Sequence, residues 1–249
     1  MKKKLSIITV VKNDEKNIEK TIKSIVFQKK KDYEYIIIDG KSNDGTITKI
    51  RKYKKKIDKI ISKKDKGIYD AMNKGLKLSK GEIIVFCNSG DFFYKNSLNK
   101  VISLFEANNY DFVFGTVMRN YTKKRILKHG FDFDRILYNF DFSTSHTTGF
   151  FLKKKIYNLI GNYNLKFRIS ADYDLYFRLY KRGLNGGFTK KNIKIGNVAS
   201  GGYSSKISFL EHLIEESKIR LHNKQNIFMV LLIFINSLIK HPLKFLGIK

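Results

Sequence analysis

The amino-acid sequence predicts an α/β fold with a mostly parallel central sheet, flanked by helices and followed by a helical C-terminal appendage. In the N-terminal part of the chain, short apolar segments rich in β-branched side chains alternate with segments whose apolar residues recur at helical spacing. Polar turns rich in glycine, asparagine and aspartate separate them. Because strands that alternate with helices of about a dozen residues form β-α-β units, we expect the strands to be parallel.

The composition supports one compact domain. The chain has 249 residues, of which 42% are hydrophobic and 14% aromatic, enough for a core. We expect a domain over residues 1–205, with halves at 1–95 and 96–205, and a helical tail over 206–249. The single cysteine, Cys87, cannot form an internal disulfide bond, which fits a reducing compartment such as the cytoplasm.

The first predicted strand covers residues 5–11, which are apolar and β-branched. The basic start and short apolar run superficially resemble a signal peptide, but no small-residue cleavage site follows, so a buried strand is the better interpretation. Asp14 is expected to cap the next helix. The apolar stripe of that helix consists of Ile18, Ile22, Ile25 and Val26.

The alternation continues with a second buried strand at 35–39 and a polar turn at 40–45. Thr46 begins the next helix, and Asp44 is its expected cap. A short third strand, a helix and a fourth strand follow at residues 57–62, 68–78 and 83–87. The second half is less regular, with strands expected at 112–118 and 147–152 and helices at 172–182 and 208–222.

The C-terminal segment 227–239 is apolar except for Asn236 and Ser237. It is shorter than the ~20 residues that a helix needs to cross a bilayer core. Lysines flank it at Lys224, Lys240, Lys244 and Lys249. We therefore expect a helix that lies in the interface of an anionic membrane; the alternative is packing within the protein or against another copy.

The chain is strongly basic, with 50 Lys and Arg against 22 Asp and Glu and a formal net charge of +28. Such a charge attracts polyanions, including anionic lipid and nucleotide diphosphates. A codon bias towards lysine, isoleucine and asparagine would also explain much of the excess. Arginine is scarce and the lysines are dispersed, so nucleic acid is not an expected partner.

Candidate functional side chains follow the predicted strands. Asp39 ends the second strand, and Asn88-Ser89-Gly90-Asp91 follows the fourth. Open α/β sheets bind ligands at the carboxyl ends of their strands, where Asp39 could accept hydrogen bonds from a base or a ribose. Asp91 could hold Mg²⁺ or Mn²⁺ together with substrate phosphates. Asp65 and Lys66 precede a helix whose N-terminus would attract a diphosphate.

Four motifs in this order carry a family resemblance. They are LSIITVVKN at 5–13, IIDGKSNDGT at 37–46, DKGIYDAMNKG at 65–75 and NSGD at 88–91. Together they resemble the family-two inverting glycosyltransferases of GT-A fold, in the branch that builds bacterial surface polysaccharides from nucleotide sugars. The resemblance continues more weakly through residues 171–175 and 201–204.

The resemblance implies a nucleotide-sugar site in the N-terminal half. Its implied residues are Val10, Lys12, Asn13, Asp39, Gly40, Asp65, Lys66 and Asn88. Asp39 would read the nucleotide, Asp65 the base, and Lys66 would help to hold the diphosphate. The family more often has proline at Val10 and tyrosine at Lys12, so Lys12 could contact a phosphate instead of a base, or be solvated.

The resemblance also implies a metal site and a general base. Asn88 and Gly90 replace two carboxylates of the family's metal motif, so only Asp91 keeps a negative charge there. Asp172 is the candidate base that removes the proton from the acceptor hydroxyl. A plain helix cap at Asp172, or Asp174 as the base, are the alternatives.

Two further positions belong to the acceptor side. Ala171 stands where the family usually has an acidic residue, directly before the candidate base. His146 resembles a family position near the acceptor, although a lone histidine is more often structural. We expect His146 to lie beside the bound substrates.

The resemblance implies an enzyme that moves a sugar, most plausibly from a UDP-sugar, to a hydroxyl of a polyprenyl-linked or saccharide acceptor, with inversion. It would work in the cytoplasm, peripherally on the inner face of the cell membrane. The alternative is a non-catalytic, membrane-associated module that binds nucleotides or polyanions, which the weakened metal motif favours. The sequence leaves the sugar, the linkage and the oligomeric state open.

Overall fold

The computed structural model describes residues 3–29, 32–122, 124–132, 134–138 and 147–242. Its main sheet has seven strands in the order β10-β6-β9-β4-β1-β2-β3. These strands are β1 Leu5–Val11, β2 Tyr33–Asp39, β3 Lys59–Ser62, β4 Ile83–Phe86, β6 Phe112–Phe114, β9 Phe150–Lys153 and β10 Gly186–Phe188. Only β9 runs antiparallel to its neighbours, so the prediction of a mostly parallel sheet is confirmed.

A second, four-stranded sheet lies beside the first, in the order β5-β11-β7-β8. Its strands are β5 Phe92–Phe93, β7 Thr116–Asn120, β8 Arg125–Lys128 and β11 Lys194–Val198. Eight α-helices accompany the sheets in the described part of the chain: α1 Ile18–Val26, α2 Thr46–Arg51, α3 Ile68–Leu78, α4 Ser97–Ala107, α5 Lys154–Ile160, α6 Ala171–Lys181, α7 Phe209–His222 and α8 Ile227–Lys240. The 3₁₀ turns are η1 Lys54–Lys56, η2 Asp134–Leu137, η3 Thr147–Gly149 and η4 Tyr203–Lys206.

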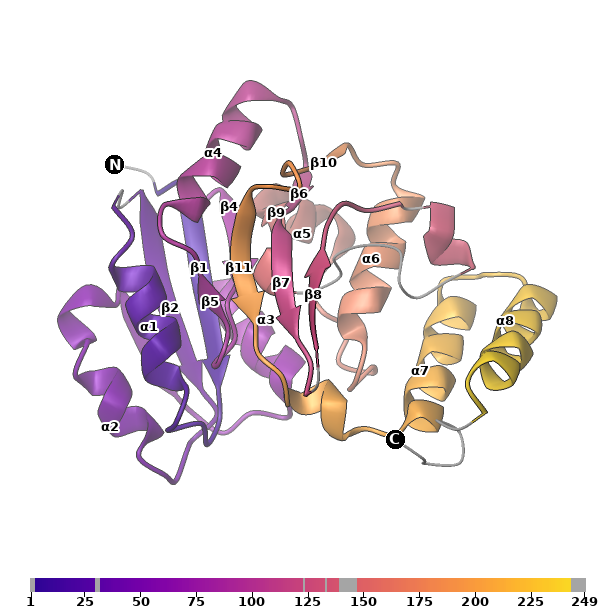
Figure 1. Ribbon diagram of the computed structural model, residues 1–249, viewed down its shortest axis with the longest axis horizontal. Coiled ribbons are helices and arrows are strands. Elements are labelled where there is room, and N and C mark those ends of the chain that lie inside the picture. The colour runs from indigo at the N-terminus through magenta and orange to yellow at the C-terminus, as the bar shows by residue number, and fades with distance from the viewer. Residues whose placement is uncertain (1–2, 30–31, 123, 133, 139–146, 243–249) are drawn as a thin grey trace.

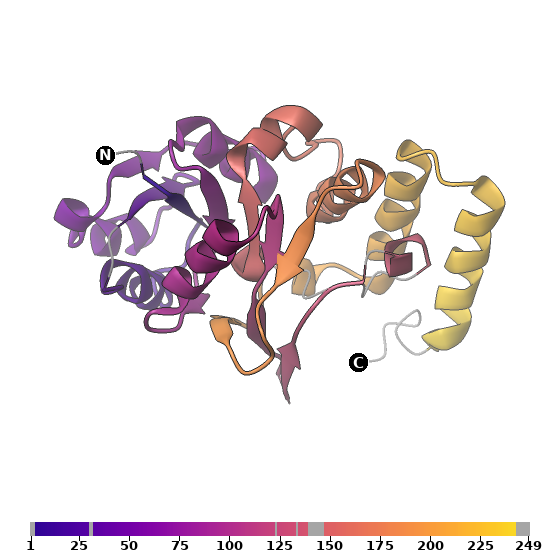
Figure 2. The ribbon, with the colours of Figure 1, turned by 90° about the horizontal axis from the view of Figure 1, so that it is seen from above.

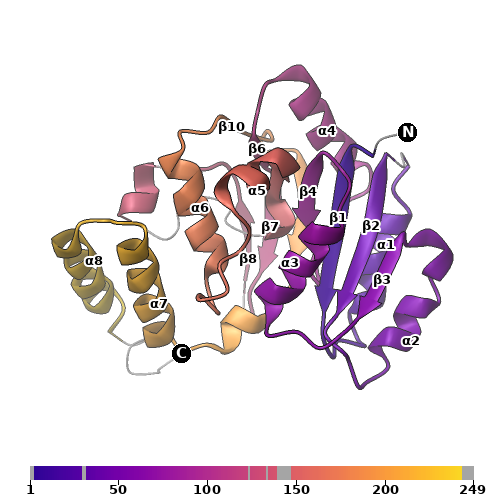
Figure 3. The ribbon, with the colours of Figure 1, turned by 180° about the vertical axis from the view of Figure 1, so that it is seen from behind.

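The main sheet has an apolar core on each face because successive side chains of a strand point to opposite sides. In β1, Ile7 packs in the cluster that includes Ile22 of α1, whereas Ile8 packs in the cluster that includes Met72 of α3. Figure 1 shows α1 and α4 on the side of the sheet that faces the viewer. Figure 3, which is the view from behind, shows α3, α5 and α6 on the opposite side of the sheet. The result is a three-layer α/β molecule, as the sequence predicts.

Two expected strands differ from the structure in an informative way. The strand expected at 112–118 is two strands, β6 and β7, which belong to different sheets. The chain changes sheet at Gly115, where a Cβ atom would lie 2.7 Å from Ile195 Cγ1. The strand expected at 147–152 begins as η3 and becomes extended only at Phe150.

The sequence predicted Asp14 as the N-cap of α1, and this prediction is wrong. The N-cap of α1 is Asn17. Asp14 instead accepts hydrogen bonds from Asn17 Nδ2 at 2.6 Å and from Ser89 Oγ at 2.7 Å. Its carboxylate therefore joins the loop after β1 to the turn after β4. The N-cap position of α2 is Gly45 rather than the predicted Asp44. Asp44 still contacts the start of this helix, because its Oδ1 accepts the Thr46 N–H at 3.0 Å.

The two C-terminal helices lie side by side at one end of the molecule, with α8 outermost (Figure 2). Helix α7 begins with a capping box between Ser208 and Glu211 and buries Leu213 and Ile219. Helix α8 buries only Val230. Its exposed apolar side chains are Ile227, Phe228, Leu231, Leu232, Ile235 and Ile239. Among the described residues, no helix has both the length and the apolar character that crossing a membrane requires.

Candidate functional site

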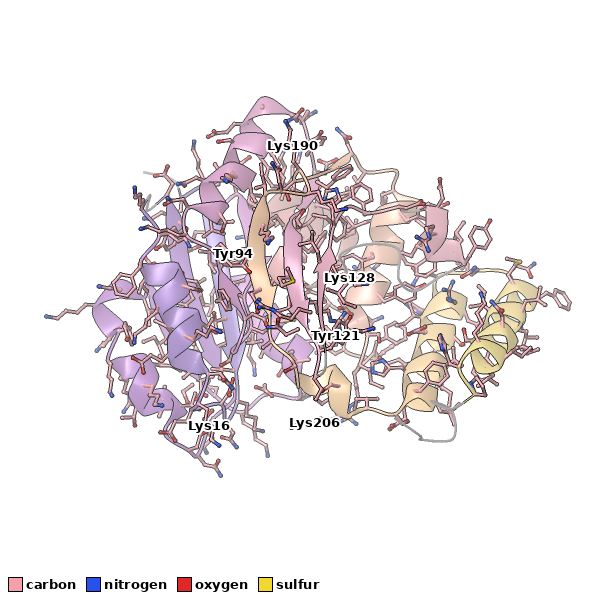
Figure 4. All side chains as sticks on the ribbon, in the orientation of Figure 1. Lys16, Tyr94, Tyr121, Lys128, Lys190 and Lys206 are labelled. Atoms are coloured by element: carbon pink, nitrogen blue, oxygen red, sulfur yellow. The ribbon has the colours of Figure 1, made fainter. Side chains whose placement is uncertain are left out.

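The carboxyl ends of β1, β2 and β4 meet at one edge of the main sheet, because these strands are parallel neighbours. In Figure 1 this edge is lowermost, and the loops after β1 and β2 run along it. Figure 4 labels Lys16, in the loop after β1, and Lys206, in η4, at the same edge. The predicted donor-site residues of the N-terminal half therefore lie at the ends of these strands or in the segments that follow the strands.

The loops after β1 and β2 are joined by Asn13. Its N–H donates to Ser42 Oγ at 2.8 Å, and its Oδ1 accepts the Asn43 N–H at 2.9 Å. Asn13 has a φ of 50°, a left-handed conformation that asparagine tolerates better than most residues. Lys12, by contrast, is exposed, and Val10 is buried. Asn13 thus shapes the edge, while Lys12 is accessible to a ligand.

Asp39 is buried at the end of β2 and accepts several hydrogen bonds. Ser42 Oγ donates to its Oδ1 at 2.5 Å, Ser62 Oγ donates to Oδ2 at 2.6 Å, and the Ser42 N–H lies 3.1 Å from Oδ2. These hydrogen bonds give the carboxylate a fixed orientation and defined partners. It is held by the loop after its own strand and by β3.

Gly40 is the point where the donor-site residues come closest together. A Cβ atom on Gly40 would lie 2.3 Å from Asp65 Oδ2 and 3.2 Å from Lys12 Cδ. Asp65 in turn accepts the Gly67 N–H at 3.1 Å, just before α3. The structure therefore brings Lys12, Asp39, Gly40 and Asp65 into one neighbourhood, and only glycine leaves room for the Asp65 carboxylate.

Lys66 is exposed directly before α3, and its N–H donates to Asp70 Oδ2 at 2.9 Å. Asp70 also forms an ion pair with Lys74 at 3.0 Å. Asn73 exchanges two hydrogen bonds with the backbone of Tyr163, at 2.8 and 3.0 Å. Within this motif, Asp70 and Asn73 are therefore packing residues, whereas Asp65 and Lys66 lie at the sheet edge.

Asp91 lies at the end of the turn after β4 and is only 4% exposed. Thr148 Oγ1 donates to its Oδ2 at 2.5 Å, and the Ala199 N–H donates to its Oδ1 at 2.8 Å. Burial raises the pKa of Asp91 to about 7. Asn88, at the start of the turn, donates to Thr147 Oγ1 at 3.2 Å, but its buried Oδ1 accepts no hydrogen bond from any described residue.

These two side chains form a hard, all-oxygen donor set. A cation would favour the ionised form of the buried Asp91 carboxylate and would give Asn88 Oδ1 the partner that it lacks. The described residues contain no group of three or more His, Cys, Asp or Glu arranged to hold a metal ion. The residues thus fit Mg²⁺ or Mn²⁺ when a substrate diphosphate supplies further ligands.

Asp172 is the second residue of α6 and is partly buried. The Tyr69 hydroxyl lies 3.0 Å from its Oδ1, and the Tyr173 N–H donates to the same oxygen at 3.0 Å. Burial raises the pKa of Asp172, and the hydrogen bond from Tyr69 offsets part of this effect. The N-cap position of α6 is Ser170, so the alternative of a plain helix cap at Asp172 is wrong. The contact with Tyr69 connects Asp172 to α3 of the N-terminal half.

The alternative base, Asp174, is fully engaged elsewhere. It is buried, its Oδ2 pairs with Arg178 Nε at 3.0 Å, and its Oδ1 accepts Asn223 Nδ2 at 2.9 Å. Because Asp174 is completely buried, an acceptor hydroxyl cannot reach its carboxylate. Asp172 therefore remains the better candidate. His146 lies outside the described residues, directly before Thr147 and Thr148, which contact the 88–91 turn.

The sequence reasoning missed several residues that shape this site. Tyr69 lies within the motif at 65–75, so that motif could have indicated it. Ser62, Thr148 and Ala199 contact the predicted aspartates from segments far along the chain. No local pattern marks such residues, because their role depends on the tertiary fold alone.

The chain is similar to known glycosyltransferase sequences. A family model for glycosyl transferase family 2 matches residues 6–185. A PGL/p-HBAD biosynthesis glycosyltransferase of Mycobacterium bovis (strain BCG / Pasteur 1173P2) is 32% identical over 162 residues, covering 63% of this chain and 62% of the relative. The poly(ribitol-phosphate) beta-N-acetylglucosaminyltransferase TarP of Staphylococcus aureus (strain N315) is 36% identical over 118 residues, covering 45% of this chain and 36% of TarP. The matches thus span less than two thirds of either relative.

Solved structures give the same fold. S. aureus TarS 1-349 in complex with UDP-GlcNAc matches with a TM-score of 0.69 at 17% identity, over 96% of this chain and 72% of that chain. The mannosyltransferase PcManGT from Pyrobaculum calidifontis, in complex with GDP-Man and Mn²⁺, matches with a TM-score of 0.60 at 16% identity, over 96% and 75%. The expected GT-A fold is confirmed. Since the family model covers most of the chain, this protein belongs to glycosyl transferase family 2.

Proposed function

We propose that this protein is an inverting glycosyltransferase that moves a sugar from a nucleotide diphosphate sugar to an acceptor hydroxyl in the synthesis of a cell-surface glycan. The observation that carries the proposal is the contact between Tyr69 and Asp172 at 3.0 Å. Tyr69 belongs to the same motif as Asp65 and Lys66, at the sheet edge. The contact therefore links the donor-binding half to the carboxylate that would receive the acceptor proton.

The donor is a UDP-sugar in this proposal. Asp39 and Asp65 would accept hydrogen bonds from the base and the ribose, and Lys12 and Lys66 would meet the diphosphate. Both lysines are exposed beside the carboxylates, so their charges are accessible to an anion. The match to TarS with bound UDP-GlcNAc supports a nucleotide-sugar donor, and the close approach of Gly40 to Asp65 supports its location.

Asp172 acts as the general base. It removes the proton from the acceptor hydroxyl while that oxygen attacks the anomeric carbon, on the face opposite the diphosphate. The bond between the anomeric carbon and the diphosphate oxygen breaks, and nucleoside diphosphate leaves. Burial raises the pKa of Asp172, which makes its ionised form a stronger base than an exposed aspartate.

Asp91 and Asn88 would hold the divalent cation, Mg²⁺ or Mn²⁺. When bound, such a cation neutralises charge on the leaving diphosphate. The burial of the Asp91 carboxylate supports this assignment, as does the buried Asn88 Oδ1, which accepts no hydrogen bond from a described residue. With only one carboxylate in the turn, we expect metal affinity to be weak until the donor diphosphate is present.

The acceptor in this proposal is a polyprenyl-linked or other saccharide at the inner face of the cell membrane. Its support is the exposed apolar side of α8, from Phe228 at 73% to Leu232 at 62% exposure, in a chain of net charge +28. An apolar helix face beside many lysines suits an anionic lipid surface. The relatives named for PGL/p-HBAD biosynthesis and for poly(ribitol-phosphate) also support transfer of a sugar to a larger acceptor.

The test of the proposal is a donor screen by mass spectrometry, with membrane extract as the source of acceptor, on the wild type and on Asp172→Asn. We expect transfer from one nucleotide sugar by the wild type, and a loss of at least about 100-fold in the variant, because general base catalysis contributes that much. Calorimetry should show unchanged binding of the nucleoside diphosphate by both. Binding without turnover by the wild type on any acceptor would instead favour the non-catalytic nucleotide-binding module.

A further inference from the structure

One carboxylate of α7 holds the loop that leads into α6. Glu215 Oε2 accepts the Arg168 N–H at 3.0 Å, and Glu215 Oε1 accepts the N–H groups of Ile169 and Ser170, each at 2.7 Å. Three consecutive backbone donors thus converge on one side chain. Charge-assisted hydrogen bonds of this kind are roughly twice as strong as neutral ones.

The same loop is held from its other side by α3. The Tyr69 hydroxyl lies 2.9 Å from the Ile169 carbonyl oxygen and 3.0 Å from Asp172 Oδ1. The peptide segment 168–170 is therefore fixed between Glu215, which binds its N–H groups, and Tyr69, which binds a carbonyl oxygen. Ser170, the N-cap of α6, makes no capping hydrogen bond with its side chain, so its backbone position depends on these neighbours.

Helix α7 is itself firmly placed. Ile219 and Arg220 are buried, and Arg220 Nη1 donates to the carbonyl oxygens of Ile136 at 3.1 Å and Leu137 at 3.0 Å. Arg220 also stacks against Tyr173, with its guanidinium carbon 5.5 Å from the ring centroid. Because close-packed contacts fix α7 in this way, α7 can also fix the position of the loop at residues 168–170 that Glu215 binds.

We propose that Glu215 is a positioning residue for the reaction: it sets the backbone of residues 168–170, and with it the direction in which Asp172 presents its carboxylate. The inference rests on the proposed role of Asp172 as general base. Glu215 touches neither substrate in this account and acts through the loop and the start of α6. Helix α7 thereby becomes part of the catalytic unit.

The test compares Glu215→Ala, Glu215→Gln and the matched control Glu211→Gln, which changes an exposed glutamate of the same helix to a residue that can still form the capping box. We measure kcat, the KM for donor and acceptor, and thermal unfolding. Supporting groups around a reactive side chain typically contribute about 10- to 100-fold. We expect Glu215→Ala to lower kcat by that factor while the donor KM changes less than about twofold, since the donor loops are not contacted.

Glu215→Gln should lower kcat by only about three- to tenfold, because its remaining oxygen can accept the two 2.7 Å hydrogen bonds from Ile169 and Ser170 but its amide group cannot accept the Arg168 N–H as well. Glu211→Gln should match the wild type. The inference is overturned if Glu215→Ala keeps wild-type kcat, or if kcat and donor affinity fall together. If Glu215→Ala does not fold, the kcat of Glu215→Gln decides: a reduction of about three- to tenfold at unchanged donor KM and melting temperature supports the inference, and wild-type kcat overturns it.

The outcome separates the inference from the proposed function. If Asp172→Asn retains wild-type turnover, the proposed base is wrong whatever the Glu215 variants do. If Asp172→Asn is inactive and Glu215→Ala is normal, the base stands and only the positioning role of Glu215 is lost. A parallel loss in both, with donor binding intact, supports the two assignments together.

Discussion

The four aspartates of the site differ mainly in their hydrogen-bond partners. Asp39 is surrounded by donors from Ser42 and Ser62, and Asp91 by donors from Thr148 and Ala199. Asp65 lies against Gly40. Asp172 receives a hydroxyl from another helix, on the same oxygen as the Tyr173 N–H. The same residue type thus has different neighbours at each position, and these neighbours fix the orientation of each carboxylate.

Substitution of Gly40 tests the donor site. Gly40→Ala places a methyl group where Asp65 Oδ2 now lies, at 2.3 Å, so the carboxylate must move. We expect the donor KM to rise at least about tenfold, because misplacement by an ångström at a binding group is costly. Steady-state kinetics with varied donor would measure this, with thermal unfolding as the check on stability. An unchanged donor KM would remove Asp65 from the proposed nucleotide site.

Substitution of Asp91 tests the metal site. Asp91→Asn keeps one oxygen that can accept a hydrogen bond but removes the charge. We expect transfer activity to fall at least about tenfold and the optimum to require much higher Mn²⁺ or Mg²⁺, because the turn then offers no carboxylate. Titration of each metal into chelator-treated enzyme gives the measurement. If the variant has the wild-type metal response, or if transfer does not depend on metal, Asp91 is not a metal ligand. Its role would then be structural, through its contacts with Thr148 and Ala199.

At the scale of elements, α3 has two tasks. Its N-terminal end presents Asp65 and Lys66 at the sheet edge, and one turn later Tyr69 reaches Asp172 of α6. Residues that are close in sequence therefore lie at the sheet edge and against α6. Helix α3 belongs to the predicted half at 1–95, and through Tyr69 it contacts the half at 96–205.

Removal of the Tyr69 hydroxyl should shift the pH profile. The hydrogen bond from Tyr69 lowers the pKa of Asp172, against the larger upward effect of burial. In Tyr69→Phe the pKa of Asp172 should rise further, so the base becomes protonated at higher pH and the acid limb of kcat/KM moves upwards. We also expect kcat at the optimum to fall about tenfold. A pH–rate profile measures both effects; a limb that stays in place would show that another group controls it.

Helix α8 should bind lipid through its exposed apolar side. Replacement of Phe228 and Leu232 by aspartate removes two large apolar side chains that would be buried in the interface, and we expect binding to vesicles with about 30% phosphatidylglycerol to fall at least about tenfold. Leu159→Asp is the matched control, because Leu159 is 51% exposed but lies on α5. Sedimentation with vesicles gives the measurement. Equal binding by all variants would assign α8 to contacts within protein instead.

Helix α7 differs from α8 in what it contacts. It buries Leu213, Ile219 and Arg220 and holds the loop before Asp172, whereas α8 is largely exposed. The predicted boundary at 205/206 places both helices in one tail. From these contacts we propose that the functional boundary lies after α7, near the turn at residues 223–226.

At the scale of the whole molecule, two sheets meet at the predicted site. The turn after β4 belongs to the main sheet, while Ala199 follows β11 of the second sheet and donates to Asp91. Gly115 allows the chain to pass from one sheet to the other. The irregular second half is thus organised around the edge that the first half forms. The formal net charge of the chain is +28, and a charge of this size attracts anions in general.

The sequence by itself determined the elements of the N-terminal half, because their patterns are local. The strand at 5–11 and the helix at 68–78 have the predicted bounds. The strand has apolar residues on both of its faces, whereas the helix has them along one face, and both patterns can be recognised within the segment itself. Local motifs also located the aspartates at the strand ends. Only the tertiary structure decided which partners those aspartates have: Thr148, Ala199, Tyr69 and Glu215 reach the site across long sequence separations. Such contacts depend on packing between elements, and no periodicity within a segment encodes them.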